Sequence, residues 1–98
     1  MSIVIIGGNE RMERIYSDTC EKYGCTAKVY TKEKGALRSK IGSPDLLIVF
    51  TNTVSHGMRE CAETEARRCN AVIARSHSSS LSALTSIMEI HCRCRMEA

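Results

Sequence analysis

Four short apolar runs, each followed by a more polar stretch, constrain the fold of this chain more than any other feature. They predict strands over residues 2–6, 26–31, 46–50 and 71–75. The first and third runs are almost continuously apolar, which is typical of strands buried on both faces. Strands that alternate with helices form a parallel sheet, because each crossover returns the chain to the same end. Right-handed crossovers then predict strand order 2-1-3-4 in a small, doubly wound, Rossmann-like α/β domain with helices on both faces.

The segments between the runs carry the start and stop signals of helices. Asn9 is placed to cap a first helix, and Gly24 ends it where a left-handed residue is favoured. A second helix is expected after Thr53 and a third after the serine run 78–80, while 32–42 holds a short helix at most. No linker, repeat or low-complexity segment interrupts the chain, so residues 1–98 are expected to form a single α/β domain.

Composition excludes several classes of protein. With 43% hydrophobic and 26% charged residues, the chain is expected to be soluble and globular. The net charge of +3 comes from scattered residues, and one phenylalanine and three tyrosines offer no stacking platform, so nucleic acid is not expected as a partner. No apolar run approaches the ~20 residues of a membrane span, and no secretion signal is recognised. A cytoplasmic protein without membrane contact is expected.

Six cysteines in so short a chain raise the question of disulfides or metal. A reducing cytosol argues against structural disulfides, and the spacings do not form the paired C-x2-C motifs of a zinc site. The densest group is His91-Cys92-Arg93-Cys94, near the end of the chain. Structural or incidental thiols are therefore expected, with metal binding by this tail as the lesser alternative.

Two loops are expected to meet where the strand order reverses, between the first and third strands. Ligands of open parallel sheets bind at this switch point, outside the carboxyl ends of the strands. The loops are 7–9 and 51–56, and loop 75–80 lines the far wall. The candidate ligand contacts in or beside these loops are Gly7, Gly8, Asn9, Met12, Asn52, Thr53, Ser55, His56, His77 and Ser78.

Most of these candidates also have an ordinary structural interpretation. The pair Gly7-Gly8 makes a tight turn and lacks the G-x-G-x-x-G spacing of dinucleotide-binding loops. Serine and threonine in such loops are common helix caps, and His77 fits a solvated loop as well as a site. His56 differs because it falls in the first turn of a helix at the switch point. There the helix N-terminus disfavours imidazolium, so His56 is the candidate metal ligand.

Catalytic groups are not arranged convincingly. No cysteine falls at a helix N-terminus, where its thiolate would be stabilised, and no carboxylate pair is placed at the switch point. A serine–histidine arrangement would lack its acid. The sequence therefore predicts a binding protein and not an enzyme.

Three stretches, residues 3–8, 45–56 and 77–81, resemble in order and spacing the short bacterial proteins of domain of unknown function 2325. The resemblance covers nearly the whole chain, and the Asn-Thr-Val-Ser-His stretch at 52–56 is its most specific part. It implies a Rossmann-like domain, usually a homo-oligomer, that binds b-type haem and is a candidate for binding or sensing dioxygen. Because C-x-x-C-H is absent, covalent attachment of haem is not expected.

What the resemblance implies can be placed on this chain. The axial imidazole would come from His56, or from His77 as second choice. Asn9 stands where some relatives carry histidine. The apolar lining and the cations for the haem propionates would come from Met12, Val54, Met58, Arg11, Arg14 and Arg59. Met12 or Met58 is an alternative sixth ligand, which would favour electron transfer over gas binding.

Two further expectations concern ligand and partner. The alternative to haem is a phosphate-bearing small molecule or nucleotide, cradled by backbone N–H groups at Gly7, Gly8, Asn9, Ser55 and Ser78. A homodimer is expected in either case, because a small open sheet has exposed edges and one copy has too little surface to enclose haem.

Overall fold

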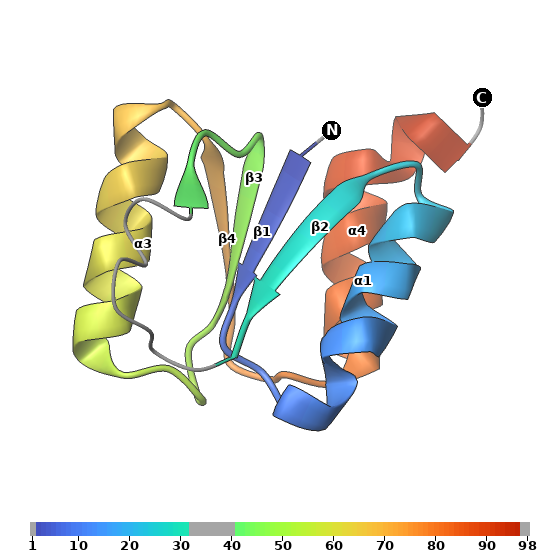
Figure 1. The fold of residues 1–98 in the computed structure, drawn as a ribbon. Coiled ribbons are helices and arrows are strands. Elements are labelled where there is room, and N and C mark those ends of the chain that lie inside the picture. The colour runs from blue at the N-terminus through green and yellow to red at the C-terminus, as the bar shows by residue number, and fades with distance from the viewer. Residues whose placement is uncertain (1, 32–40, 97–98) are drawn as a thin grey trace.

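The strands form one parallel four-stranded sheet in the order β2-β1-β3-β4, which confirms the predicted topology (Figure 1). The computed structural model describes residues 2–31 and 41–96, with side chains up to residue 91. The strands are β1 (Ser2–Ile6), β2 (Thr26–Tyr30), β3 (Leu46–Phe50) and β4 (Val72–Ser76). Their bounds agree with the prediction to within one residue. The short helix predicted within 32–42 lies mostly outside the described residues.

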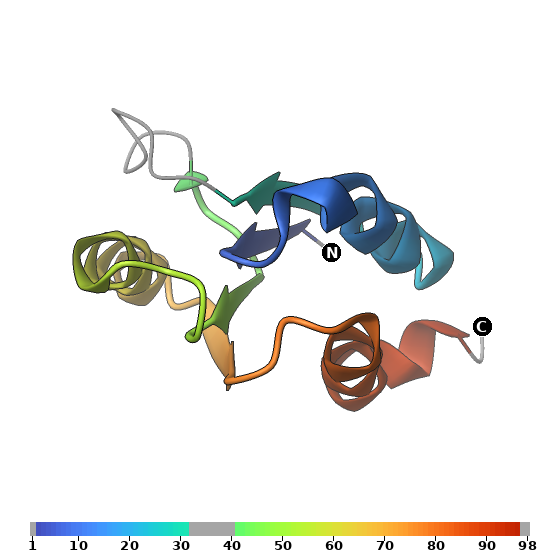
Figure 2. The ribbon, with the colours of Figure 1, turned by 90° about the horizontal axis from the view of Figure 1, so that it is seen from below.

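Helices cover both faces of this sheet, as a doubly wound fold requires. They are the 3-10 helix η1 (Glu10–Met12), α1 (Glu13–Lys22), α3 (His56–Arg68) and α4 (Leu81–Met96). Seen from below, α1 and α4 lie on one side of the sheet and α3 on the other (Figure 2). The side chain of Asn9 accepts from Arg11 N at the start of η1, and Ser55 Oγ accepts from Met58 N at the start of α3. Helix α1 follows η1 directly and has no side-chain cap of its own.

The apolar core is divided by the sheet into two halves. One half lies under α1 and α4 and includes Tyr16 and Phe50, whose ring centroids are 5.3 Å apart. The other half lies under α3 and includes Met58 and Ala62. Strand β3 is fully buried, which explains why its run is continuously apolar.

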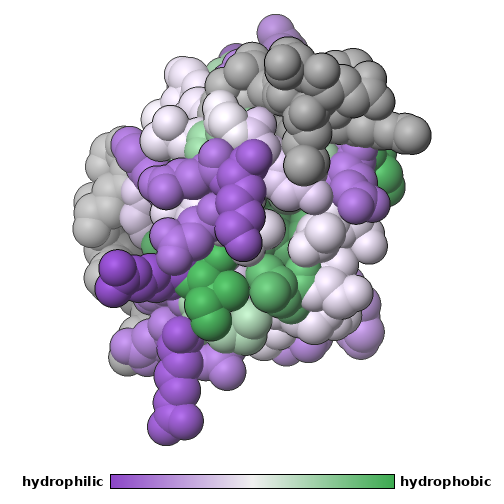
Figure 3. Space-filling view, turned by 90° about the vertical axis from the view of Figure 1, so that its right-hand side faces the viewer, coloured by the Kyte–Doolittle hydropathy of each residue, from purple (hydrophilic) through white to green (hydrophobic). Residues whose placement is uncertain are grey.

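Some apolar surface stays exposed on the face that α1 and α4 form. Figure 3 shows an apolar patch there, among charged side chains. Ile15 of α1 and Leu81 of α4 are 44% and 39% exposed. Across the described parts of the chain, 2–31 and 41–96, no helix is both long and apolar enough to cross a membrane.

Candidate functional site

The turn after β1 is packed closely against the loop after β3, so the protein's own side chains occupy part of the expected switch-point crevice. Both Gly7 and Gly8 have φ of +92°, a conformation that favours glycine. A Cβ atom on Gly7 would lie 2.5 Å from Val54 Cγ1, and one on Gly8 would lie 2.7 Å from the ring of Tyr16. The two glycines are thus required for close packing of the turn.

Four of the five backbone N–H groups expected to cradle an anion already have acceptors within the fold. Gly7 N donates to Tyr30 O at 2.8 Å, and Gly8 N donates to Thr53 Oγ1 at 2.7 Å. Asn9 N donates to Tyr16 Oη, and Ser78 N donates to Ser76 Oγ, both at 3.3 Å. A ligand at this place would have to displace these internal hydrogen bonds, so phosphate binding by these loops stays a prediction.

Tyr16 forms hydrogen bonds to both the loop after β1 and the loop after β4, a role that the sequence analysis did not predict. Its side chain is fully buried, and its hydroxyl donates to Ser79 O at 2.6 Å while accepting from Asn9 N. Residues 16 and 79 are far apart in the chain, so helical periodicity marks Tyr16 only as a core residue. The hydroxyl therefore links the loop after β1 to the loop after β4 at this edge of the sheet.

Removing the hydroxyl of Tyr16 is expected to lower the stability of the protein. In Tyr16→Phe, the carbonyl of Ser79 and the N–H of Asn9 lose a partner in a partly buried place, which costs about 1–3 kcal/mol of unfolding free energy. Urea denaturation measures the loss. Tyr23→Phe, at a second buried tyrosine beyond the other end of α1, is the control and is expected to change stability by less than about 0.5 kcal/mol. Equal losses in both variants would contradict the role of the Tyr16 hydroxyl as a link between the two loops.

The other predicted contacts lie in separate local environments in the described structure. Asn52 and His77 are exposed, Ser55 caps α3, and the hydroxyl of Ser78 bonds to Ser80. Met12 lies beside the hydroxyl of Tyr16, with its sulfur 3.8 Å from that oxygen. Their roles toward a ligand stay predictions.

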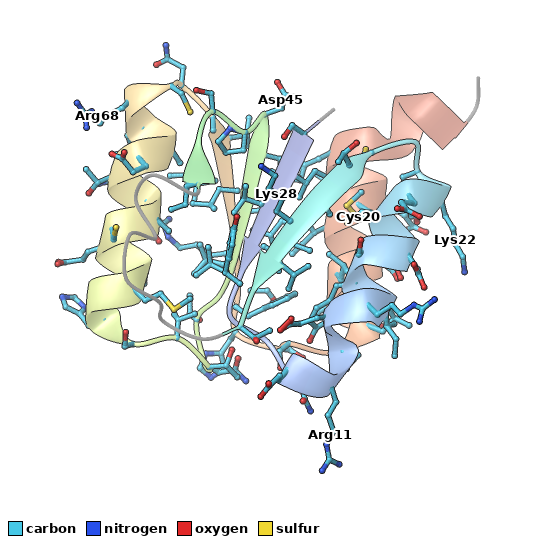
Figure 4. The ribbon with its side chains drawn as sticks, in the orientation of Figure 1. Arg11, Cys20, Lys22, Lys28, Asp45 and Arg68 are labelled. Carbon is cyan, nitrogen blue, oxygen red and sulfur yellow. The ribbon has the colours of Figure 1, made fainter. Side chains whose placement is uncertain are left out.

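The residues proposed for the faces and edges of haem are also dispersed. Met58 is only 3% exposed and packs under α3, and Val54 packs against Gly7. The side chain of Arg11 in η1 points away from the fold (Figure 4), and Arg14 is exposed on α1. Of the three arginines expected to pair with propionates, Arg59 alone lies in a groove with His56.

His56 lies at the start of α3, but its side chain faces away from the core. Its imidazole is 82% exposed, and Nε2 lies 3.0 Å from Oε1 of Glu60, one helical turn on. A groove of about 470 Å³ runs along this side of the helix, which we call the α3 groove. It is lined by His56, Arg59, Glu60, Glu63, Thr64 and Arg67.

A buried carboxylate within the α3 groove gathers three arginines. Glu63 is 5% exposed, and Arg75 of β4 binds it with two hydrogen bonds of 2.8 and 2.9 Å. Arg59 donates to it at 3.1 Å, and Arg67 lies 3.5 Å away. These four residues are the Glu63 cluster. Three guanidinium groups against one carboxylate leave two positive charges uncompensated within it.

This charge balance changes the titration of Glu63. Hydrogen bonds from Arg75, opposed by burial and assisted by Arg59, lower the pKa of the carboxyl from 4.5 to about 2. The same contact raises the pKa of Arg75. Glu63 is therefore ionised throughout the neutral range and holds the guanidinium groups in place. The sequence signal was the i, i+4 spacing of 59, 63 and 67; the contribution of β4 required the fold.

Metal-ligating groups do not cluster in the residues described. There, no group of three or more histidine, cysteine and carboxylate side chains could hold a metal ion, and the cysteines at 20, 25, 61 and 69 are thiols and not disulfides. The tail 91–94 lies outside the described side chains, apart from His91, so its metal binding stays a prediction. Haem iron can be held by one imidazole such as that of His56, whereas a zinc site needs three or four protein ligands.

The sheet order and the two helical layers define a small, doubly wound α/β protein of Rossmann-like type. The chain belongs to the family described as uncharacterized protein conserved in bacteria (DUF2325), whose model matches residues 2–91. This match confirms the resemblance seen in the sequence. Comparison with curated proteins and with solved structures gave no match.

Proposed function

We propose that this protein binds haem in the α3 groove, with His56 as the axial ligand, and that it takes up a diatomic gas reversibly as a carrier or sensor. The observation that carries the proposal is the exposed imidazole of His56 in a groove that also holds two arginines. Haem held there by His56 would supply an iron atom, the chemistry needed to bind dioxygen or another small gas.

The contact between His56 and Glu60 supports the ligand role. If Nε2 donates to the carboxylate over their 3.0 Å, Nδ1 keeps a lone pair for a metal. A carboxylate on the second ring nitrogen orients an imidazole ligand and raises its basicity. Glu60 thereby takes the positioning role that the sequence alone did not assign.

The arginines of the groove support binding of the haem propionates. Arg59 and Arg67 are 41% and 65% exposed, so their remaining N–H donors reach solvent while Glu63 holds the groups in place. Guanidinium groups bind carboxylates through pairs of parallel hydrogen bonds, which suits propionate. Arg67, absent from the sequence-based candidates, replaces the distant Arg11 and Arg14 in this role.

One copy of the chain supplies no apolar side chains of the described α3 groove to cover the faces of the porphyrin. All six described residues lining the α3 groove are polar or charged, so they fit the iron and the propionates but leave the apolar macrocycle uncovered. Burying that macrocycle needs apolar surface from elsewhere. The proposal therefore includes a homodimer, in which a second copy completes the enclosure.

A phosphate-bearing small molecule is the alternative ligand, favoured by the excess of guanidinium groups in the Glu63 cluster, which stays positive by one charge when the carboxylate of Glu60 in the same groove is counted. Phosphate oxygens pair with guanidinium as carboxylates do, and the nearby hydroxyl of Thr64 is a further donor. This alternative moves the anion from the switch-point loops, where four of the five expected donors are engaged, to the outer side of α3.

Titration of the purified, haem-free protein with ferric haemin tests the proposal. A saturable Soret band, shifted from that of free haemin, is the expected result, together with a further shift when the reduced complex meets carbon monoxide. If haemin gives no saturable band while sodium pyrophosphate raises the thermal midpoint, the haem proposal is wrong and the phosphate alternative stands.

A further inference from the structure

The outer edge of β4 presents backbone groups that no strand of the described residues pairs with. Val72 N donates to Asp45 O at 3.1 Å and Ser76 O accepts from Thr51 N at 2.8 Å, so residues 72, 74 and 76 face β3. The alternate residues, Ile73 and Arg75, then direct their N–H and C=O groups away from the sheet. Within the described part of the chain, no strand pairs with this edge.

This edge also lacks the features that usually protect an edge strand. It contains no proline and no lysine, and Val72 is 48% exposed. Its one charged side chain, Arg75, is bound to Glu63 across the sheet face. The opposite edge differs, because Lys28 of β2 is exposed there (Figure 4). Strand β4 is therefore the edge that fits a further strand.

We propose that β4 pairs antiparallel with β4 of a second copy, forming a continuous eight-stranded sheet about a two-fold axis at Ala74. In this register, Ile73 lies opposite Arg75 of the second copy, and both such pairs exchange N–H···O bonds, giving four in all. Ala74 lies opposite its own copy, where its small side chain permits the close approach of a non-hydrogen-bonded pair. Val72 lies opposite Ser76 and loses its exposure.

A second copy fits this edge because the antiparallel register about Ala74 pairs all of residues 72–76 and places the smallest side chain of the strand where the two backbones approach most closely. The two-fold axis is perpendicular to the sheet, so α3 of both copies lies on one face. The inference rests on the edge alone and does not depend on the identity of the ligand.

Charge opposes this pairing in one respect. The Glu63 cluster of each copy carries two uncompensated positive charges on the same face, near the shared edge. Experiments are therefore best done at about 0.15 M salt or above, where the Debye length is about 8 Å or less.

Disulfide trapping tests the register directly. Ala74→Cys places two thiols across the axis with Cα atoms about 4.5 Å apart, within the range for a disulfide. After oxidation with copper phenanthroline, we expect a dimer of about 22 kDa, twice the 10.9 kDa chain, with residue 74 linked to its own copy in the peptide map. The unmodified chain, treated alike, controls for native thiols.

A second pair of variants keeps the test independent of how Ala74→Cys folds. Val72→Cys mixed with Ser76→Cys should form a 72–76 link between chains, whereas neither variant alone should link through its new cysteine. Links at 72–72 or 76–76, or no link at any of these positions under the same oxidation, would overturn the register.

Sedimentation at micromolar concentration tests the surface. The unmodified chain should be a dimer, and Val72→Lys should shift it to monomer by placing a charge on the edge. Ile15→Lys, the matched change at an exposed apolar residue of α1, should stay dimeric. A monomeric unmodified chain, or loss of the dimer in Ile15→Lys but not in Val72→Lys, would overturn the proposal.

Discussion

Replacing Gly7 by alanine is expected to destabilise the protein by about 3 kcal/mol or more, because the new Cβ atom has no space and the backbone no alternative. At φ of +92°, an alanine pays for the left-handed conformation. Its Cβ would also meet Val54 Cγ1 at 2.5 Å, Thr53 Oγ1 at 2.9 Å and the backbone oxygen of Phe50 at 3.0 Å. The turn after β1 would separate from the loop after β3.

Gly24→Ala separates these two causes. Gly24 also has a positive φ, +74°, but a Cβ atom there meets nothing within 4 Å. We expect a loss of about 1–2 kcal/mol from backbone strain alone. Chemical denaturation of both variants gives the comparison. If Gly7→Ala is no less stable than Gly24→Ala, the close packing of the switch-point turn is not what the structure indicates.

Replacing Glu63 by glutamine is expected to cost about 1–3 kcal/mol at neutral pH and to change how stability depends on acid. The folded carboxyl has a pKa of about 2 against 4.5 for the ordinary group, so it stabilises the fold above about pH 4.5. This contribution is lost as pH falls toward 2. Because the arginines around it are about half exposed, solvent screening keeps the effect below the full value of the shift.

Glu60→Gln is the matched control in the same groove. Glu60 is 67% exposed and pairs with His56, so its loss should change stability by less than about 0.5 kcal/mol. Unfolding free energies measured from pH 7 to pH 3 should fall less for Glu63→Gln than for the unmodified chain. Parallel curves for the two proteins would contradict the role of Glu63 as the anchor of the cluster.

The architecture followed from local patterns because each strand is a compact run with its own boundaries. Leu46–Phe50 is fully buried in the centre of the sheet, so its sequence is continuously apolar and predicts a strand directly. Strand order then followed from the handedness of the crossovers. The predicted strand 71–75 ends one residue before β4 does. Ser76 belongs to β4 because it pairs with Phe50, and a serine followed by a histidine is not a sequence signal for a strand.

The site was harder to predict because it depends on how α3 is rotated about its axis. Met58, Ala62 and Ala66 pack on the sheet, so His56 and Glu60 face outward along α3 and not into the switch point. That rotation was present in the spacing of the apolar residues. The bond between Arg75 and Glu63 was not, because it joins a strand and a helix and requires their packing.

Haemin titration of three proteins tests the central claim most directly: the unmodified chain, His56→Ala and His77→Ala. His77 is the matched control, since it is an exposed histidine outside the α3 groove. The account predicts that the unmodified chain and His77→Ala give the same saturable Soret band, and that His56→Ala loses it at equal haemin concentration. Equal occupancy and band position in His56→Ala would contradict His56 as the ligand, and loss of the band in His77→Ala alone would transfer that role to His77.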